Sequence, residues 1–240
     1  MHEIARQQFI SHFNTESLMV RSPARINVAG EHMDYNLGSS MAAAIDREIT
    51  VCIQKNNTRD IGIYASDFNE EVIGSIDHLL PAANHWSNYI YGVVAELKSR
   101  GVELSGFNCS FGGSIPIGAG LSSSAAVTSG IAFSLLHLIK LNISKKELAK
   151  ICMNAEHKFA DVKCGLLDPL TILLGKTDKA LLLNFKTLEH DYIDLETGEY
   201  RFLLFNSNVS HSLSESGHLN ERFESCHKGL RVLKNHFSDV

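Results

Sequence analysis

Glycine and serine concentrate in one short stretch of the chain, GGSIPIGAGLSSSAAV, at residues 112–127. Glycines let backbone N–H groups approach an anion without obstruction by a side chain. The serines stand where a long apolar run begins, and a helix N-terminus offers unpaired N–H donors and the positive end of its dipole. The stretch therefore fits a phosphate-binding loop, although it lacks the lysine of a Walker A loop. A tight turn before a helix uses the same residue types, so composition alone leaves both interpretations open.

A second stretch, residues 22–45, gathers polar side chains between apolar flanks (SPARINVAGEHMDYNLGSSMAAAI). Its hydrogen-bonding residues are Arg25, Glu31, His32, Asp34, Tyr35 and Asn36. Carboxylates accept hydrogen bonds from sugar hydroxyls and a tyrosine adds apolar contact, so this density of polar groups suits a polyhydroxyl ligand. Taken alone, the stretch could equally be a solvated loop, and Arg25 and Asp34 could form a structural ion pair.

The elements that would position these residues are a mixture of strands and helices. Strand-like runs occur at residues 48–55, 60–66, 106–113, 179–185 and 201–208. Helical patterns occur at residues 88–99, 121–141, 145–159 and 213–236. The early strands follow one another directly, which excludes a regular doubly wound parallel sheet and predicts an α+β fold.

Two of the helices have clear end signals. Ser144 and Glu147 have the spacing of a capping box at the start of the helix over 145–159. The helix over 88–99 is expected to end at Gly101, because glycine tolerates the left-handed conformation of a helix C-terminus.

Composition limits the classes of function. Of the 240 residues, 44% are hydrophobic and 20% are charged, as in ordinary globular domains. A net charge of −5 without a basic cluster argues against a nucleic-acid partner. The most apolar run, residues 125–139, is too short to span a membrane, and the first ten residues lack the apolar core of a signal peptide. Five scattered cysteines without metal-ligand or redox spacing fit reduced thiols, so we expect a cytoplasmic protein without membrane association.

Together the two stretches resemble the GHMP small-molecule kinases and, within them, the galactokinases. ARINVAGEHMDYN resembles the galactokinase signature, and PIGAGLSSSAA resembles the GHMP phosphate loop. Further similar segments follow in the same order: HWSNYIYGVVAELKSRG, AEHKFADVKCGLLDPL, LLNFKTLEHDYIDL, SNVSHSL and SESGHLNERFESC. The resemblance covers most of residues 18–228. It implies a GHMP-kinase N-terminal domain with the ribosomal protein S5 domain 2-like fold over residues 1–200, and the start of a truncated C-terminal domain over residues 201–240.

Galactokinases transfer the γ-phosphoryl group of ATP to the C1 hydroxyl of galactose. The resemblance therefore implies a phosphotransferase with an alcohol acceptor, ATP and Mg²⁺ as cofactors, and galactose or a related sugar as substrate. It implies that Asp168 is the catalytic base, because a carboxylate within reach of the hydroxyl takes its proton. Arg25 falls on the partner arginine, which stabilises charge on the transferring phosphoryl group. Positioning and electrostatics then supply most of the catalysis.

The resemblance also implies which residues bind the substrates. The sugar-contacting positions are Glu31, His32, Asp34 and Gly165. The phosphate-cradling positions are Gly118, Ala119, Gly120, Leu121, Ser122, Ser123 and Ser124. Trp86 falls near the adenine pocket, and Ser124 and Glu156 fall on positions that hold Mg²⁺. Each role has a structural competitor: His32 could satisfy a backbone carbonyl, Trp86 could be a core aromatic, and Glu156 could be a solvated helix residue.

Three features depart from the family pattern. Pro169 replaces a glutamine and restricts the backbone of Asp168. Because proline favours the first helical position, we expect Asp168 to be the N-cap of a helix that starts at Pro169. Leu219 stands where the family has a sugar-contacting tyrosine, so one hydrogen bond to the sugar is expected to be lost. The family's third glycine-rich motif is not found in these 240 residues, so we expect a dimer partner or a C-terminal half to cover an apolar face or strand edge.

Two other functions stay open. One is a galactokinase relative with little catalysis that binds sugar or nucleotide as a sensor, or an inactive fragment. The other, a GHMP kinase for a non-sugar alcohol, fits less well, because residues 31–36 match the sugar-kinase pattern.

Overall fold

The computed structural model describes residues 2–83, 85–207 and 218–237, and it has the α+β fold that the sequence predicts. The strands are β1 (Leu18–Ala29), β2 (Ser39–Lys55), β3 (Asp60–Ala65), β4 (Glu70–Ser75), β5 (Phe107–Gly113), β6 (Lys179–Asn184) and β7 (Glu189–Asp194). The helices are α1 (His2–Phe13), α2 (Ser87–Ser99), α3 (Ser123–Leu138), α4 (Lys145–Phe159), α5 (Leu167–Leu174) and α7 (His218–Lys234).

The long strand β2 organises a mixed sheet of seven strands within the described residues. One edge of β2 pairs with β1, from Leu18 opposite Ile53 to Ala29 opposite Met41. The other edge pairs with β5 through residues 49–55 and with β6 through residues 39–42. Strand β3 lies parallel to β5, and β4 and β7 complete the order β4-β3-β5-β2-β6-β7. Strand β1 and the end of β5 therefore both lie beside β2.

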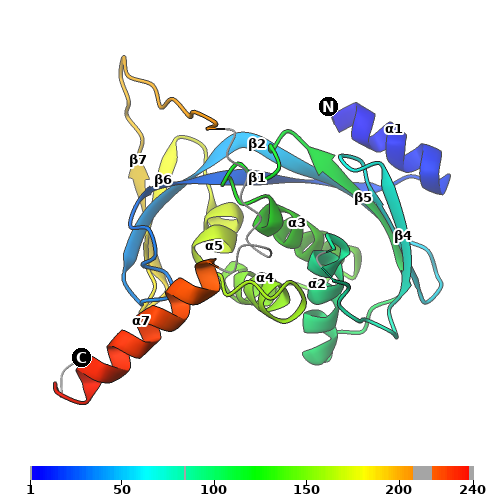
Figure 1. Ribbon diagram of the computed structural model, residues 1–240. Helices are drawn as coiled ribbons and strands as arrows, with labels where there is room; N and C mark the ends of the chain where they lie inside the picture. The colour runs from blue at the N-terminus through cyan, green and yellow to red at the C-terminus, as the bar shows by residue number, and fades with distance from the viewer. Residues whose placement is uncertain (1, 84, 208–217, 238–240) are drawn as a thin grey trace.

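The sheet curves around a layer of helices, α2 to α5, while α1 lies against its opposite face (Figure 1). Helix α3 packs against β1 and β2 and also against α2, α4 and α5. Such a helix must be apolar on nearly all sides, and most of its residues are buried. Fully buried side chains from both layers, such as Ile53, Phe107 and Ile131, form the core. Burial of α3 fixes the position of its N-terminus, where the serines lie.

Local signals placed two helix ends correctly. Helix α4 spans Lys145–Phe159 as predicted, and the Ser144 hydroxyl accepts a hydrogen bond from the Glu147 N–H at 3.2 Å. The Glu147 carboxylate itself pairs with Arg100. Helix α2 ends where predicted: Gly101 has φ +78°, and its N–H bonds to a carbonyl of the last helical turn at 2.9 Å.

Other elements differ from the sequence-based expectation. Strands β1, β4 and β7 and helix α1 were not predicted, and β2 begins at Ser39 rather than residue 48. The predicted strand over 201–208 is wrong for residues 201–207, which form no strand. A strand needs a neighbour for its N–H and C=O groups, and no strand in the described part of the chain pairs with this segment. Residue 208, most of SNVSHSL and residues 213–217 of the predicted last helix lie outside the described residues.

The expectation that Asp168 caps a helix beginning at Pro169 is also wrong. Helix α5 begins two residues earlier, at Leu167, and its N-cap is Leu166. Pro169 is therefore the third helical residue, where an N–H group has no intrahelical partner to lose. The buried side chain of Leu167, which packs with Leu170 and Leu181, favours the earlier start. Among the described helices, none has the length and apolar character needed to cross a bilayer.

Candidate active site

The glycine- and serine-rich loop connects β5 to the N-terminus of α3. Gly118 and Gly120 have φ values of +72° and +73°, a conformation that favours glycine. A side chain at Gly120 would have no atom within 4 Å, so backbone conformation rather than space requires glycine there. Ser122, the N-cap of α3, is also left-handed, at φ +60°. Its hydroxyl caps no N–H group and donates instead to Asp168, which leaves the first-turn N–H groups available to an anion.

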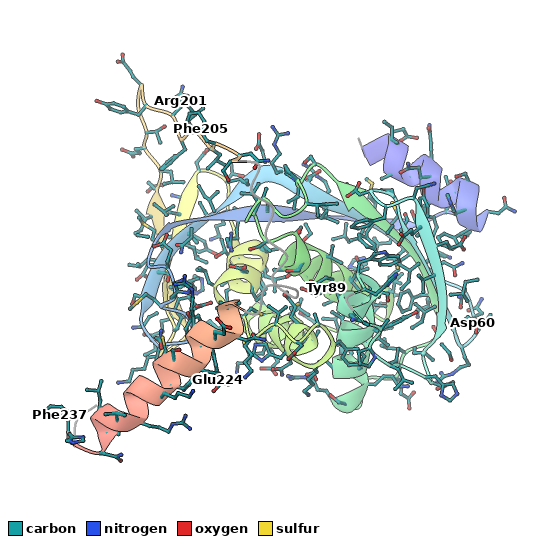
Figure 2. All side chains as sticks on the ribbon, viewed as in Figure 1. Asp60, Tyr89, Arg201, Phe205, Glu224 and Phe237 are labelled. Carbon is teal, nitrogen blue, oxygen red and sulfur yellow. The ribbon has the colours of Figure 1, made fainter. Side chains whose placement is uncertain are left out.

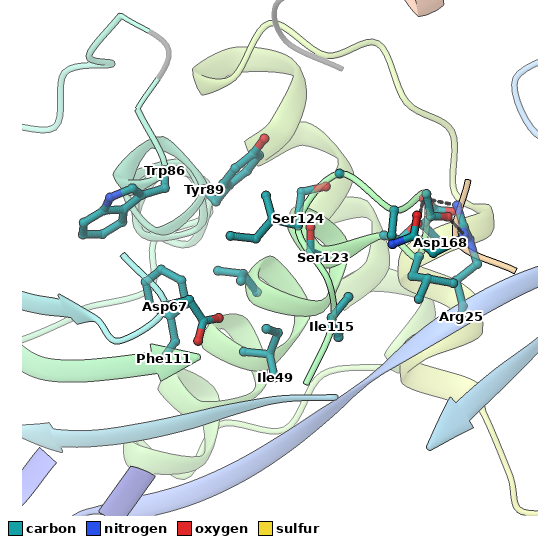
Figure 3. Close-up of a pocket in the computed structure, with 18 of the residues that line it drawn as sticks. Arg25, Ile49, Asp67, Trp86, Tyr89, Phe111, Ile115, Ser123, Ser124 and Asp168 are labelled. Atoms are coloured by element: carbon teal, nitrogen blue, oxygen red, sulfur yellow. Dashed lines mark hydrogen bonds and ion pairs between the residues drawn. The ribbon is translucent and has the colours of Figure 1, made fainter. Parts of the chain in front are cut away.

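A cavity of about 500 Å³ opens beside this loop and contains several of the predicted residues (Figure 3). Its lining residues are Arg25, Ile49, Asp67, Phe68, Trp86, Tyr89, Phe111, Ile115, Ile117, Gly118 to Ser124, Val127, Asp168 and Phe205 to Ser207. Figure 3 shows the aromatic residues and Asp67 at one end, the pair Arg25 and Asp168 at the other, and Ser123 and Ser124 between them. The cavity therefore has an apolar end and a charged end on either side of a helix N-terminus.

The aromatic end is built around Trp86. The Phe68 ring is nearly parallel to the Trp86 ring with the centroids 6.4 Å apart, and the Phe111 ring meets it edge-on with the centroids 5.5 Å apart. The indole N–H of Trp86 donates to Glu70 at 2.8 Å. Asp67 lies between these rings and the sheet; burial raises its pKa, and the Gly113 N–H donates to its carboxylate at 3.2 Å. A flat aromatic ligand fits between such walls.

Arg25 joins three parts of the site. Its Nε and Nη2 donate to the two carboxylate oxygens of Asp168 at 2.6 Å and 2.9 Å, and its Nη1 donates to the Gly120 carbonyl at 2.9 Å. The two side chains are 15% and 24% exposed. Such a bidentate pair has fixed geometry and is partly desolvated. Strand β1 thus positions Asp168 and the phosphate loop at the same time.

Asp34 lies against the backbone of Gly165 and does not line the cavity beside the loop. A Cβ atom at Gly165 would fall 1.9 Å from Asp34 Oδ2, so only glycine permits this approach. The Tyr35 N–H donates to Asp34 Oδ1 at 3.0 Å, and the Leu167 N–H donates to Oδ2 at 3.5 Å. Burial, followed by the nearby charge of Asp168, raises the pKa of Asp34. Asp34 and Asp168 therefore form a pair of neighbouring carboxyl groups.

Glu156 is buried within α4 behind the phosphate loop, so it is not a solvated helix residue. Burial and the charge of Asp168 raise its pKa to about 8, while hydrogen bonds with Ser124 and Thr128 oppose the increase. A buried carboxylate beside a hydroxyl is an oxygen donor set that suits Mg²⁺, which takes few protein ligands and completes its shell with water and phosphate oxygens. Ser124 and Glu156 therefore fit a Mg²⁺ site. In the described part of the chain, no three His, Cys, Asp or Glu side chains gather to hold a metal by themselves.

Glu31 and His32 are not brought to the cavity beside the loop. Glu31 is exposed. His32 has φ +62°, and its Nδ1 lies 2.6 Å from the Tyr35 hydroxyl. It lines a separate, open cavity of about 450 Å³ between the 30–38 loop and α7, together with Tyr35, Glu221, Arg222, Ser225 and Cys226. Leu219, in the first turn of α7, does not line this cavity.

Several residues of the site were not identified from the sequence. Asp67, Phe68, Tyr89 and Phe111 line the aromatic end of the cavity. Tyr89 is close to Trp86 in the sequence, and Phe111 directly precedes the glycine loop, so the positions of both residues could have indicated a role in the site.

Burial, followed by the charges of Glu156, Asp168 and Asp34, raises the pKa of Cys164 well above its ordinary value, which keeps a neutral thiol among the carboxyl groups.

Comparison with known proteins relates this geometry to one family. The model of the "GHMP kinases N terminal domain" matches residues 88–176, and that of the "Galactokinase galactose-binding signature" matches residues 7–55. Galactokinase of Thermotoga maritima is 38% identical over 225 residues, which cover 93% of this chain and 62% of that protein. Galactokinase of Roseiflexus sp. is 34% identical over 236 residues, which cover 98% of this chain and 60% of that protein.

Among solved structures, that of Lactococcus lactis galactokinase complexed with galactose is similar, with a TM-score of 0.94 and 30% identity. The match covers 99% of this chain and 62% of that chain. This chain thus spans about 60% of the length of the relatives that it matches. The two matched ranges include Arg25, Asp34, the phosphate loop, Glu156 and Asp168, whereas Trp86 lies just before the second range. The fold, the paired motifs and these matches agree: the chain contains a GHMP-kinase N-terminal domain and a galactokinase galactose-binding signature, and nearly its whole length is similar to part of the galactokinases.

Proposed function

We propose that this chain is a sugar kinase that transfers the γ-phosphoryl group of ATP to the C1 hydroxyl of galactose, with Mg²⁺ as cofactor. The observation that carries the proposal is the position of Asp168. Its carboxylate is held by Arg25 at the charged end of the phosphate-loop cavity and lies beside the carboxyl group of Asp34. A base at the junction of a nucleotide cavity and a polar sugar loop is what phosphoryl transfer to a hydroxyl requires.

In this proposal, Asp168 takes the proton of the attacking hydroxyl, whose oxygen forms the new bond to phosphorus while ADP leaves with the electrons of the broken bond. Arg25 orients the carboxylate through two hydrogen bonds and carries positive charge toward the transferring group. The free N–H groups at the start of α3 bind phosphate oxygens. Ser124 and Glu156 would hold Mg²⁺, which neutralises phosphate charge when bound.

The substrates are assigned to the two sides of Asp168. The aromatic end, with Trp86 and Phe68, takes the adenine ring, since stacked side chains 6.4 Å apart offer flat apolar surfaces. Asp34 and the neighbouring polar loop take the sugar, because a carboxylate accepts hydrogen bonds from its hydroxyls. The matched signature and the galactose complex of a relative support galactose as the sugar. Glu31 and His32 contribute at the open side of this loop.

The test is release of ADP from the purified chain with ATP, Mg²⁺ and galactose, against a control without sugar. Galactose-dependent release supports the proposal. A folded protein whose melting temperature rises with galactose or ATP, but which releases no ADP, would instead be the sensor suggested by Leu219 and Pro169.

We also propose a domain boundary near residue 200, with a further body of protein packed on the segment that follows. Supporting this, the consecutive residues Phe202, Leu203, Leu204 and Phe205 are 53–85% exposed, and a run of exposed apolar side chains marks an interaction surface. A second copy of the chain or a C-terminal half would cover it. Sedimentation between low and high protein concentration distinguishes self-association from a monomer.

A further inference from the structure

Helix α7 contacts two loops that are far apart in the sequence, and both carry residues of the sugar side of the site. One is the 30–38 loop between β1 and β2, and the other is the turn over 160–166 between α4 and α5. Figure 1 shows the N-terminal end of α7 directed toward the α4 and α5 layer, while its C-terminal end projects away from the fold. Glu224, in the middle of α7, is labelled in Figure 2.

Asn220 bonds to two backbone groups of the second loop, one on each side of Val162. Its Oδ1 accepts from the Lys163 N–H at 2.9 Å, and its Nδ2 donates to the Asp161 carbonyl at 2.8 Å. Asp161 has φ +53°, a left-handed conformation that non-glycine residues adopt at a cost. A side-chain amide that satisfies the carbonyl of this residue and the N–H two residues later holds the turn in its observed shape.

The next turn of α7 adds a second contact to Lys163. Lys163 Nζ pairs with Glu224 and lies 5.6 Å from the centre of the Phe223 ring. Both charged side chains are more than a third exposed, so water weakens this ion pair. The two backbone hydrogen bonds of Asn220 are therefore the stronger connection.

Two residues of α7, Phe223 and Cys226, contact the 30–38 loop. The rings of Phe223 and Tyr35 lie 5.6 Å apart, and the Asn36 side chain donates to Cys226 Sγ at 3.6 Å. Tyr35 in turn bonds His32, and its backbone N–H bonds Asp34. Helix α7 thus connects the 30–38 loop to the turn at 161–163.

The turn continues directly into the contact between Gly165 and Asp34. Gly165 is two residues after Lys163, and its backbone lies so close to the Asp34 carboxylate that there is no room for a side chain at this position. Leu167, two residues later, donates to the same carboxylate. None of these residues lines the nucleotide cavity, so we expect a change in the turn to affect the sugar side more than the nucleotide side.

We propose that Asn220 is a positioning residue for the sugar: by holding the turn at 161–163, it sets Gly165 against Asp34 and so determines the affinity for galactose but not for nucleotide. The part of this inference that concerns galactose affinity rests on the proposed function. That Asn220 holds the turn is a separate claim, and hydrogen exchange tests it.

The experiment compares Asn220→Ala with Asn235→Ala, an exposed asparagine beyond the end of the same helix. Galactose and ADP are titrated by calorimetry into the wild type and each variant of this 240-residue chain, and hydrogen exchange is followed over residues 160–168. For Asn220→Ala we expect galactose affinity to fall about tenfold or more, ADP affinity to stay within about twofold, and exchange of the Lys163 amide to accelerate about tenfold. Asn235→Ala should match the wild type. Asn220→Asp keeps the acceptor for Lys163 and should show an intermediate loss, and it serves as the test if Asn220→Ala does not fold.

Each outcome is decisive. Unchanged galactose affinity in Asn220→Ala, or equal loss of both ligands, overturns the positioning role. If the wild type binds ADP but not galactose, both the proposed function and the claim about galactose affinity fail. Hydrogen exchange at the Lys163 amide still decides whether Asn220 holds the turn.

Discussion

Replacing Gly165 by alanine is the most direct test of the sugar side of the site. The new Cβ would lie 1.9 Å from Oδ2, 2.2 Å from Cγ and 2.9 Å from Cβ of Asp34. Ordinary van der Waals contact begins at 3.4 Å, so the carboxylate must retreat by about 1.5 Å. Rotation of the carboxylate alone is not sufficient, because Asp34 Cβ is itself too close. The 30–38 loop or the turn before α5 must therefore move as well.

The cost follows from the hydrogen bonds that this movement breaks. The carboxylate loses the N–H of Tyr35, now at 3.0 Å, and the longer contact to Leu167. Weakening hydrogen bonds to a mostly buried charged group costs about 1–3 kcal/mol, and alanine returns about 0.4–1 kcal/mol through the unfolded chain. We expect a net loss of about 1–2 kcal/mol in stability. Displacement of Asp34 should weaken galactose binding about 10- to 100-fold.

The assay measures KM for galactose and for ATP, with urea unfolding for stability. KM for ATP should stay within about twofold, because neither Gly165 nor Asp34 lines the nucleotide cavity. The matched control is Gly229→Ala on α7, where a Cβ meets no atom within 4 Å; alanine there should be neutral or slightly stabilising. If Gly165→Ala binds galactose as tightly as the wild type, the close contact with Asp34 has no role in sugar recognition and the argument is refuted.

Three further predictions concern the rest of the site. Asp168→Asn should lower kcat about 10²- to 10⁴-fold while ADP still binds, and an unchanged kcat would exclude Asp168 as the base. Trp86→Ala should raise KM for ATP about tenfold with little effect on KM for galactose; equal changes in both would place Trp86 in the core instead. Glu156→Gln should remove a pH dependence in metal-free buffer. The folded pKa of Glu156 lies near 8, above the value of 4.5 in an unfolded chain, so the wild type is most stable at low pH and loses stability as pH rises between these values. The full interval corresponds to roughly 5 kcal/mol of unfolding free energy. Urea unfolding at pH 5 and pH 9 should show the wild type approaching this loss of stability, while the stability of Glu156→Gln changes little. Parallel pH profiles of the two proteins would contradict the prediction.

What the sequence predicted well was decided by neighbours along the chain. The capping serine and the glycine at a helix end placed α4 and the end of α2, because a helix closes its hydrogen bonds within a few residues. The glycine loop was recognised for the same reason: Gly118, Gly120 and the serines determine its backbone conformation and the N-terminus of α3 locally.

What the sequence did not predict depends on distant partners. In the sequence of β1, Pro23 and Arg25 interrupt the pattern of a strand. The segment becomes a strand because it pairs along β2, with a shift of register between these two residues. The segment over 201–207 has a strand-like composition, but it pairs with no strand in the described structure and its apolar side chains stay exposed. Asp168 has the local signature of an N-cap, yet burial of Leu167 starts α5 earlier and leaves the carboxylate free to bond Arg25.

The same distinction separates the two halves of the site. The proposed nucleotide half takes its glycines and serines from one continuous stretch, β5, the glycine loop and α3, while Trp86, Phe68 and Arg25 come from other elements. The sugar half is assembled from the 30–38 loop, the turn at 161–165 and α7, which meet only through tertiary contacts such as those of Asp34 with Gly165 and of Asn220 with Lys163. Contacts of this kind shift together when one of them is removed. In the proposed function we therefore expect sugar affinity to depend on residues such as Asn220 that hold these loops together, and nucleotide affinity to depend on residues that line the cavity itself.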